Sequence, residues 1–488
     1  MAKTTLRVVV IGAGMSGILA AIKLQQAGYT DVIVYEKADR IGGTWRENTY
    51  PGLTCDVPSH HYTYSFERNP DWTRHLPPGG EIQAYFERVT DSYHVRESIR
   101  FNTEVVAASY RDQRWHLELA DGSRDSADVV IAATGVLHHP SWPEIPGMDT
   151  FRGALFHSAR WDHSVPLAGK RVGIVGMGST GVQIVSELSA AGVAVSHFVR
   201  TPQWIMPVEN GYFPEQERAA FRADPELLNR TMDFEGYAAS VDAYTQALTN
   251  PDSEVAIAMS TACRENLQQG VHDATLREQL TPDHEPFCKR LIFSPDYYQA
   301  IQRPNAHLVR SDIRCIEPGG IRTGDGCLHE LDVIALATGF RADQFMRPMR
   351  IHGRDGLDLE TLWAKRPVAY LAVAMPDFPN FFMLNGPNGP VGNFSLIEIA
   401  EIQWRYIEQL LERLRSGEYR AISPTRDAME AFDSERVAAA KKTIWYTGGC
   451  QSWYLDAEGI PASWPWSFSK FVSMMREPEW RHYQLTTE

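Results

Sequence analysis

Two charged residues occupy equivalent positions after two copies of one glycine-rich pattern. Glu36 lies 24 positions after Gly12, and Arg200 lies 24 positions after Gly176. At the end of the second strand of a dinucleotide site, a carboxylate accepts a hydrogen bond from a ribose 2′-hydroxyl, whereas an arginine pairs with a 2′-phosphate. The hydroxyl of Thr201 can add to that phosphate contact. Either charge alone could be an exposed side chain at a strand end, but the matched spacing favours FAD beside Glu36 and NADPH beside Arg200.

Each glycine pattern stands between a short apolar run and a helical pattern. The two segments are Arg7-Val-Val-Val-Ile-Gly-Ala-Gly-Met-Ser-Gly17 and Arg171-Val-Gly-Ile-Val-Gly-Met-Gly-Ser-Thr-Gly181. In such a unit the first glycine makes the turn, the second admits a pyrophosphate to the backbone, and the third packs helix against strand. The helix N-terminus then faces the phosphates. The predicted nucleotide-binding residues of these segments are Gly12, Gly14 and Gly17 in the first, and Gly176, Gly178, Ser179, Thr180 and Gly181 in the second.

A second repeat favours a paired topology for the two units, with strands suited to crossing between them. Asp128-Val-Val-Ile-Ala-Ala-Thr-Gly135 matches Asp332-Val-Ile-Ala-Leu-Ala-Thr-Gly339, and both have the composition of buried strands. We expect helices over 18–27 and 182–191, each ended by a glycine. The sequence therefore predicts an α/β fold with two dinucleotide-binding, Rossmann-like domains, one for FAD and one for NADP.

The order of these segments predicts the domain boundaries. The FAD-binding domain is expected at residues 1–145 and 340–488, and the NADP-binding domain at residues 146–205 and 286–339. Residues 206–285 are rich in Ala, Glu, Gln, Leu and Arg and poor in glycine, which favours helices. We interpret this segment as a helical insertion that covers the active site; an appendage without ligand contacts has the same composition.

The composition excludes several other classes of protein. A net charge of −14 over 488 residues argues against a nucleic-acid partner, which needs a basic surface. The six cysteines lack C-x-x-C spacing, so they predict no metal site, and scattered single thiols favour a reducing compartment. No uninterrupted apolar run reaches about 18 residues, so we expect a cytoplasmic protein without a membrane span.

Two further motifs carry a resemblance to a known family. Residues 42–56 read Gly-Gly-Thr-Trp-Arg-Glu-Asn-Thr-Tyr-Pro-Gly-Leu-Thr-Cys-Asp, and residues 151–162 read Phe-Arg-Gly-Ala-Leu-Phe-His-Ser-Ala-Arg-Trp-Asp. Both motifs resemble the fingerprints of the type I Baeyer–Villiger monooxygenases, class B flavoproteins of the flavin-containing monooxygenase superfamily. The positions concerned are Gly43, Thr44, Trp45 and Asp56 at the predicted FAD site, and Phe151, Gly153, His157 and Trp161 in the second fingerprint.

The resemblance implies an activity and a pair of catalytic residues. In that family a C4a-peroxyflavin anion formed with O2 attacks a ketone, and an ester or lactone results while NADP+ stays bound. The family's essential arginine corresponds to Arg290 in the segment Pro286-Phe-Cys-Lys-Arg290. Asp56 corresponds to the carboxylate that orients this arginine, and Lys289 to a second contact with the 2′-phosphate. From spacing alone, a solvated face is the preferred interpretation of a Lys-Arg pair, and only the resemblance reverses that preference.

The second fingerprint is expected to couple the domains rather than to transfer protons. His157 and Trp161 are four positions apart, which places them on one face if the segment is helical. Trp45 stands where disulfide reductases of this two-nucleotide layout carry the first of two redox cysteines, and no C-x(4)-C spacing follows it. The residue types therefore exclude a disulfide reductase.

Two segments near the C-terminus each have two interpretations. Ser395 and Glu398 have the S-x-x-E spacing of a capping box, so a helix is expected to begin there, either simply as a core helix or also facing the flavin. The tail is dense in aromatic residues, which we interpret as core packing rather than substrate contacts. These residues are Trp445, Tyr446, Trp453, Tyr454, Trp464 and Trp466.

Two other functions fit parts of the pattern. An N- or S-oxygenating flavin monooxygenase shares the nucleotide motifs, but it usually has Tyr where Trp161 stands. A catalytically idle nucleotide-binding protein is disfavoured because Asp56 and Arg290 are both present.

Overall fold

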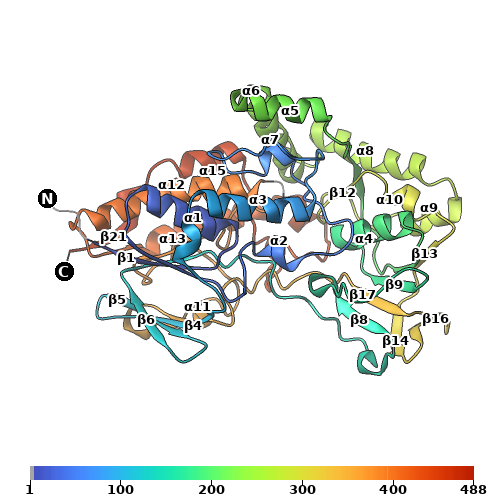
Figure 1. Ribbon diagram of the computed structural model, residues 1–488, viewed down its shortest axis with the longest axis horizontal. Helices are drawn as coiled ribbons and strands as arrows, with labels where there is room; N and C mark the ends of the chain where they lie inside the picture. The colour runs from blue at the N-terminus through green and yellow to red at the C-terminus, as the bar shows by residue number, and fades with distance from the viewer. Residues whose placement is uncertain (1–4, 393, 488) are drawn as a thin grey trace.

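Two five-stranded parallel sheets form the centres of the two halves of the chain (Figure 1). The computed structural model describes residues 5–392 and 394–487. The first sheet, ordered β19-β7-β1-β2-β3, consists of β1 (Arg7–Ile11), β2 (Asp31–Tyr35), β3 (Ile99–Arg100), β7 (Val129–Ala132) and β19 (Phe381–Met383). The second sheet, ordered β13-β10-β9-β17-β8, consists of β8 (Ala154–His157), β9 (Arg171–Val175), β10 (Ala194–Phe198), β13 (Ala306–Val309) and β17 (Val333–Leu336).

Each sheet carries one glycine-rich strand–turn–helix unit. The helix α1 (Met15–Gln26) follows β1, and α4 (Ser179–Ala190) follows β9. Both helices begin before the predicted positions 18 and 182, because the last glycine of each pattern lies inside the first helical turn. A Cβ atom on Gly17 would lie 1.8 Å from the Gly12 carbonyl oxygen, and one on Gly181 would lie 2.0 Å from that of Gly176. Glycine is a poor helix former, but here the missing side chain lets the helix pack against the turn.

The two halves share further details that follow the sequence repeat. Asp128 accepts a hydrogen bond from the backbone N–H of Arg7 at 2.8 Å, and Asp332 accepts one from that of Arg171 at 2.9 Å. An antiparallel meander precedes the strands β7 and β17. The meander strands are β4 (Val105–Arg111), β5 (Arg114–Leu119) and β6 (Arg124–Ala127), joined by β18 (Arg350–His352), and β14 (Ile313–Glu317), β15 (Gly320–Thr323) and β16 (Leu328–Glu330). The prediction of an α/β fold with two Rossmann-like units is confirmed.

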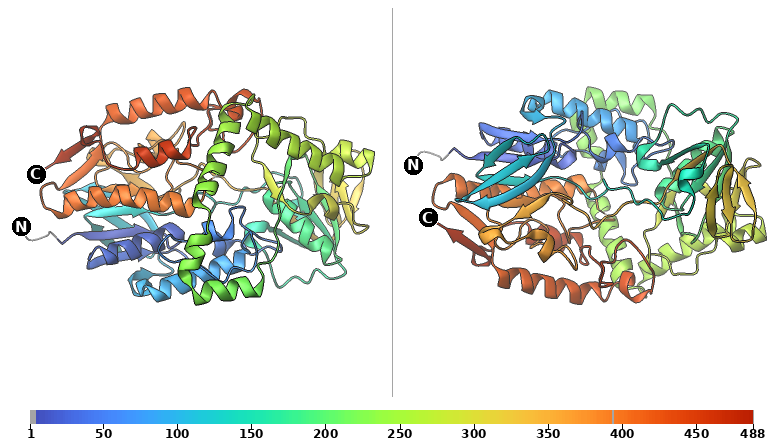
Figure 2. Two further views of the ribbon diagram at one scale, coloured as in Figure 1. Left: turned by 90° about the horizontal axis from the view of Figure 1, so that it is seen from above. Right: turned by 90° about the horizontal axis from the view of Figure 1, so that it is seen from below.

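A group of helices lies between β11 (Ile205–Pro207) and β12 (Ile292–Ser294), two strands that pair in parallel. The helices are α5 (Glu215–Ala223), α6 (Pro225–Thr231), α7 (Phe234–Thr249), α8 (Glu254–Gly270) and α9 (Ala274–Leu280). In Figure 2 the green helices of this segment cross the boundary between the two halves. Apolar side chains from α7 and α8, such as Tyr244 and Leu267, pack in the same core as the second sheet.

The C-terminal part of the chain returns to the first half. There α12 (Leu396–Arg415) packs beside α1, and β20 (Ala421–Pro424) pairs with β21 (Tyr483–Thr486), so both chain ends lie at one end of the molecule (Figure 1). The other helices are α2 (Thr44–Glu47), α3 (Gly79–Ser92), α10 (Tyr297–Ala300), α11 (Leu359–Leu362), α13 (Arg426–Ala440), α14 (Ile444–Thr447) and α15 (Phe468–Met474). Over residues 5–392 and 394–487, no helix has the length and apolar character that a membrane crossing requires.

The close contact inside the second glycine-rich unit predicts a position-specific loss of stability. Gly181→Ala would force a Cβ atom against the Gly176 carbonyl oxygen, so we expect the free energy of unfolding to fall by about 1–3 kcal/mol. Gly178→Ala is the matched control, because a Cβ atom there would meet no atom within 4 Å. Denaturant unfolding followed by circular dichroism measures both variants. Equal stability of the two variants would contradict the packing role of Gly181.

Candidate active site

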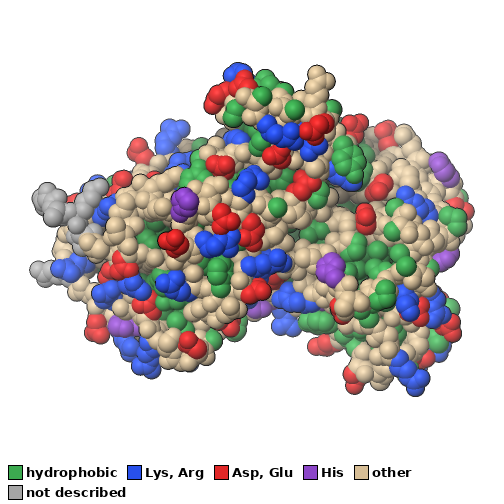
Figure 3. Space-filling model, in the orientation of Figure 1, with side chains coloured by type: hydrophobic (Ala, Val, Ile, Leu, Met, Phe, Trp, Pro, Cys, Tyr) green, Lys and Arg blue, Asp and Glu red, His purple; other side chains and the backbone are tan. Residues whose placement is uncertain are grey.

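The two halves border a large cavity. Its volume is about 1760 Å³, more than the roughly 300–1,000 Å³ typical of a site for one drug-sized ligand. The lining comes from both glycine-rich units, the helices of residues 215–280 and the C-terminal tail. Figure 3 shows the molecule hollowed at its lower edge between the halves, with Lys and Arg side chains above the notch. The volume and the lining fit two dinucleotides.

Most of the predicted site residues line this cavity. They are Gly12, Gly14, Glu36, Gly43, Thr44, Trp45 and Asp56 from the first half, and Gly176, Gly178, Ser179, Thr180, Arg200, Thr201, Lys289 and Arg290 from the second. Gly17 and Gly181 lie behind the turns, where they pack helix against strand. The lining does not include the second-fingerprint residues Phe151, Gly153, His157 and Trp161.

Glu36 follows β2 and lies beside the first glycine-rich turn. Its buried carboxylate accepts hydrogen bonds from the backbone N–H groups of Ala13 at 2.7 Å and Ala38 at 2.9 Å. Across the turn, Gly43 approaches Gly14 so closely that a Cβ atom on Gly43 would lie 3.1 Å from the Gly14 Cα. The bare backbone and the fixed carboxylate suit a pyrophosphate and a ribose hydroxyl.

Arg200 and Lys289 bring two positive charges to the equivalent place in the second half. Arg200 is exposed shortly after β10, and Lys289 is half-buried on the loop after α9. Burial lowers the pKa of Lys289; Asp283 opposes this effect, and the charge of Arg200 lowers the pKa further. In the described part of the chain, neither cation forms an ion pair within 4.0 Å. Two neighbouring cations without a paired carboxylate fit a phosphate group.

Asp56 and Arg290 form an ion pair, although 234 positions separate them in the sequence. Oδ2 of Asp56 accepts a hydrogen bond from Nη2 of Arg290, and the two side chains are 26% and 23% exposed. Burial by itself lowers the pKa of Arg290, but the charge of Asp56 raises it, and the net result lies well above the usual value. The guanidinium therefore stays charged throughout the working pH range.

Two residues outside the predicted set complete the surroundings of Arg290. Its Nη1 donates a hydrogen bond to the backbone oxygen of Gly392 at 2.5 Å. The Tyr454 hydroxyl lies beside the same guanidinium, since a Cβ atom on Gly392 would lie 2.2 Å from that hydroxyl and 3.1 Å from Nη1 of Arg290. Burial raises the pKa of Tyr454, and the charge of Arg290 partly offsets that increase. The sequence interpretation of the tail was core packing, and no spacing connects Tyr454 to an arginine so far away in the sequence.

The segment that carries Asp56 docks onto α4. The Tyr50 hydroxyl donates to Oε1 of Gln183 at 2.9 Å, and Nε2 of Gln183 donates to the Thr54 backbone oxygen at 3.1 Å. Gly52 has a φ of +80°, and a Cβ atom there would lie 2.6 Å from the Gln183 carbonyl oxygen. Only glycine allows so close an approach, so the Tyr-Pro-Gly part of the first fingerprint joins the two halves next to Asp56.

The second fingerprint is not helical, and the prediction of a shared helix face for His157 and Trp161 is wrong. His157 ends β8, and Trp161 follows the short 3-10 turn Ser158–Arg160. Nδ1 of His157 accepts from the Ala159 N–H at 3.1 Å, so its Nε2 donates to the Gly339 backbone oxygen at 3.1 Å. A spacing of four residues also fits a strand end followed by a tight turn, which explains the error.

The remaining fingerprint residues pack around β8. The ring of Phe151 folds over Gly153, where a Cβ atom would lie 2.7 Å from it. The indole of Trp161 meets the ring of Phe156 edge to face at 4.9 Å. His157 therefore lies where the chain leaves the second sheet at Gly339, whereas Phe151 and Gly153 lie at the other end of β8, beside Asp332.

The aromatic tail is divided between the core and the cavity wall. Trp445, Tyr454 and Trp464 are buried, whereas Tyr446 and Trp453 are 43% and 45% exposed. Trp453 and Tyr454 also line the cavity. Core packing therefore describes part of the tail, and two of its rings face the site as well.

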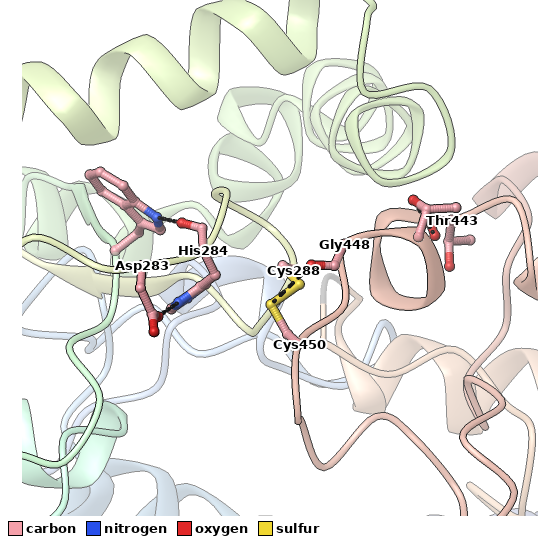
Figure 4. Close-up of a disulfide and its surroundings, with 8 residues drawn as sticks. Asp283, His284, Cys288, Thr443, Gly448 and Cys450 are labelled. Atoms are coloured by element: carbon pink, nitrogen blue, oxygen red, sulfur yellow. Dashed lines mark hydrogen bonds and ion pairs between the residues drawn. A yellow bond between two sulfur atoms is a disulfide. The ribbon is translucent and has the colours of Figure 1, made fainter.

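Two of the six cysteines are not single thiols. Cys288 and Cys450 form a disulfide (Figure 4), and Cys55, Cys263, Cys315 and Cys327 are free. The expectation of scattered single thiols is wrong for this pair. Its partners are 162 positions apart, so no local spacing could reveal it.

The helix α12 begins after Ser395, but without the predicted capping box. The Ser395 hydroxyl donates to the His61 backbone oxygen at 3.0 Å and makes no side-chain hydrogen bond to the helix. Glu398, in the first turn, is half-buried. Burial raises the pKa of Glu398 to about 7, and the charge of Glu401 adds to the increase while that of Arg68 opposes it.

Comparison with known proteins places the chain among the monooxygenases. Residues 9–212 match the family model described as pyridine nucleotide-disulphide oxidoreductase. An uncharacterised monooxygenase of Mycobacterium tuberculosis (strain ATCC 25618 / H37Rv) is 48% identical over 98% of this chain and 96% of its own. A Baeyer-Villiger monooxygenase of Streptomyces coelicolor is 38% identical over 98% of this chain and 92% of its own.

Solved structures of known proteins match the fold over the whole chain. Cyclohexanone monooxygenase from Rhodococcus sp. Phi1 bound to NADP+ gives a TM-score of 0.87 at 30% identity and covers 100% of both chains. The OTEMO complex with FAD and NADP gives a TM-score of 0.87 at 27% identity, also over 100% of both chains.

The fold and the site define a flavoprotein monooxygenase with two nucleotide-binding units. The chain belongs to the Baeyer–Villiger monooxygenase family. The resemblance drawn from the fingerprints is thus confirmed. The position on α2 where disulfide reductases carry a redox cysteine holds Trp45, whose Nε1–H donates to the Tyr62 hydroxyl at 3.0 Å.

The raised pKa of Glu398 predicts a pH-dependent difference in stability. Because the folded protein disfavours the ionised form, stability is lost as the pH rises from about 4.5 to about 7. Glu398→Gln removes this penalty, so the variant should gain stability over the parent across that interval and keep the gain above it. Thermal unfolding at several pH values measures the difference. Glu477→Gln, which alters an exposed carboxylate, is the control. Parallel stability curves for parent and Glu398→Gln would refute the burial argument.

Proposed function

We propose that the protein converts a ketone and O2 to an ester or lactone, using FAD and consuming NADPH. The observation that carries the proposal is the Asp56–Arg290 ion pair in a cavity that both glycine-rich units line. The relatives named Baeyer-Villiger monooxygenase and cyclohexanone monooxygenase, which match over nearly the whole chain, support a ketone substrate.

Each nucleotide is assigned to one glycine-rich unit. The first unit, with Glu36 and the Gly43 backbone, would hold FAD, and the second, with Arg200, Thr201 and Lys289, would hold NADPH. When bound, NADPH supplies a hydride and FAD passes the electrons on to O2. The charge after the second strand supports this assignment, because the second unit has Arg200 at the position where the first has the carboxylate of Glu36.

Arg290 is proposed as the catalytic cation. Its guanidinium cannot give up a proton at working pH, so it can face an oxygen that must remain negatively charged without neutralising it. Asp56 and the Gly392 carbonyl hold the guanidinium from two sides and fix its direction. A charged group fixed before the reaction stabilises developing negative charge more effectively than one that must reorient.

The proposed domains follow the predicted boundaries. Residues 1–145 and 340–488 would bind FAD, residues 146–205 and 286–339 would bind NADP, and residues 206–285 would cover the active site. The cavity lining supports that cover, because Tyr237, Val241, Tyr244 and Met259 from α7 and α8 contribute to it. The hydrogen bond from His157 to the Gly339 carbonyl supports domain coupling as the role of the second fingerprint.

Removing the proposed catalytic cation should separate flavin reduction from oxygenation. Arg290→Ala should retain FAD and still be reduced by NADPH, but the rate of ester formation should fall about 10²–10³-fold. Arg290→Lys should also be slow, because an ammonium does not reproduce the planar guanidinium. Stopped-flow absorbance follows reduction, and mass analysis of products follows oxygenation across cyclic, linear and aryl ketones and a thioether. Arg481→Ala, a surface change, is the control. Near-parental ester formation by Arg290→Ala, or oxidation of the thioether alone, would overturn the proposal.

The cation pair should set the choice of nucleotide. A charge-assisted contact to phosphate contributes roughly 1.5–3 kcal/mol, or about 10- to 150-fold in affinity. Arg200→Ala should therefore raise the Michaelis constant for NADPH by about that factor while leaving the value for NADH little changed. Steady-state oxidation of both nucleotides by parent and variant measures the ratio. Equal use of NADPH and NADH by the parent enzyme would contradict the assignment of Arg200.

A further inference from the structure

The disulfide joins the loop that carries Arg290 to the C-terminal tail (Figure 4). Cys288 immediately precedes Lys289 and Arg290, and Cys450 lies in the tail that follows α14. The Cα atoms of the two cysteines are 5.9 Å apart, and the bond closes a separation of 162 residues. Cys288 is fully buried and Cys450 is 8% exposed. The bond thus lies beside the residues assigned to the phosphate and the substrate oxygen.

The loop before Arg290 is held in an unfavourable backbone conformation. Phe287 has a φ of +70°, in the left-handed region that bulky residues seldom occupy. Such a conformation persists only where the surroundings impose it. Here the ring of Phe287 packs edge to face on Tyr244 at 5.3 Å, and the next residue, Cys288, is fixed by the disulfide.

The same two segments meet a second time at Tyr454. Its hydroxyl lies beside Arg290, since both groups approach Gly392, and its ring stacks on Trp445 at 4.5 Å and on Trp453 at 4.1 Å. The tail therefore meets the Arg290 loop at two points, the disulfide and the Tyr454 hydroxyl.

The bond also crosses the boundary between the halves. The tail follows α12 and α13, which belong to the first half, but Ile444, Trp445 and Tyr454 pack in the core of the second sheet and the insertion. The approach is tight at Gly448, where a Cβ atom would lie 2.5 Å from Sγ of Cys288. A glycine at this position lets the tail pass over the disulfide.

We propose that the Cys288–Cys450 disulfide is a redox-sensitive clasp on the active site. In the oxidised form it keeps Tyr454 against Arg290 and fixes the loop of Lys289 and Arg290. A dithiol reductant attacks the more exposed sulfur of Cys450, and Cys288 leaves as a thiolate and takes up a proton. The second thiol of the reductant then displaces Cys450, so two electrons and two protons pass to the protein and the reductant becomes a cyclic disulfide. The tail is then released and Arg290 is less well placed. The kinetic consequence rests on the function proposed above.

Whether the Cys288–Cys450 disulfide is formed can be measured without an activity assay. The FAD-loaded enzyme as isolated under air should show four free thiols after denaturation in an alkylating reagent, and six after treatment with dithiothreitol. Lys441 and Lys442 are exposed just before the tail, so trypsin can cut there. The fragment from residue 443 onward should stay attached under non-reducing conditions only. In the reduced enzyme, trypsin should cut this site severalfold faster.

Activity tests the consequence for Arg290. Because a displacement of about 1 Å can lower a rate up to about 10²-fold, we expect dithiothreitol to slow ester formation roughly tenfold at saturating NADPH. An external disulfide should restore the rate.

Cysteine variants test the same consequence. Cys450→Ser should have the rate of the reduced enzyme, and dithiothreitol should not change it. Cys327→Ser, which alters an exposed free thiol, should respond to dithiothreitol as the parent does. Gly448→Ala keeps both cysteines but places a Cβ atom against Sγ of Cys288, so this variant should form the disulfide less readily.

Each outcome decides the proposal. Six free thiols in the enzyme as isolated under air, or equal trypsin sensitivity and equal rates in the two redox forms, would overturn it. If no form of the enzyme makes ester, the proposed function fails, while thiol titration and proteolysis still decide whether the clasp exists. If the disulfide is absent and ester forms at the same rate with and without dithiothreitol, the proposed function stands and the clasp is refuted.

Discussion

The contact between Asp56 and Arg290 depends on the way the two halves of the molecule meet. A guanidinium that is largely removed from water is costly unless a negative partner and hydrogen-bond acceptors surround it. Here the partner, Asp56, is the last residue of the first fingerprint, while Arg290 follows the helical segment of the second half. Gly392 and Tyr454 approach from the C-terminal part of the chain. Four segments that are distant in sequence therefore converge on one charged group.

The two glycine-rich units are closely alike in structure and differ mainly in charge. The turns, the packing glycines and the aspartates that hold the last strands are nearly the same in both halves. The difference lies in the charge that follows the second strand, Glu36 in one half and Arg200 in the other. Lys289 joins Arg200 from the loop that also carries Arg290. The cation proposed to contact a phosphate and the cation proposed for catalysis are thus adjacent in one loop.

The cavity is closed by parts of the chain that do not belong to either sheet. The helices of residues 215–280 and the aromatic tail both contribute to its wall, and they pack on each other through α14 and α7. Because the tail starts from the first half and packs in the core of the second, it restrains the halves as well as covering the site. The disulfide strengthens this restraint next to Arg290.

The sequence by itself determined the repeated units, the opposite charges that follow their second strands and the family, because each depends on residue types at short, regular spacing. Local patterns predicted the secondary structure and its caps less well where a contact with a residue distant in sequence determined the local conformation. Gly17 and Gly181 lie inside helices because they touch a turn, His157 ends a strand because β8 pairs with β17, and Ser395 bonds to His61 instead of capping its helix. Only the tertiary structure brought Cys288 to Cys450 and Tyr454 to Arg290. Contacts across more than a hundred residues leave no periodic trace in a single sequence, since they depend on how whole sheets and helices pack.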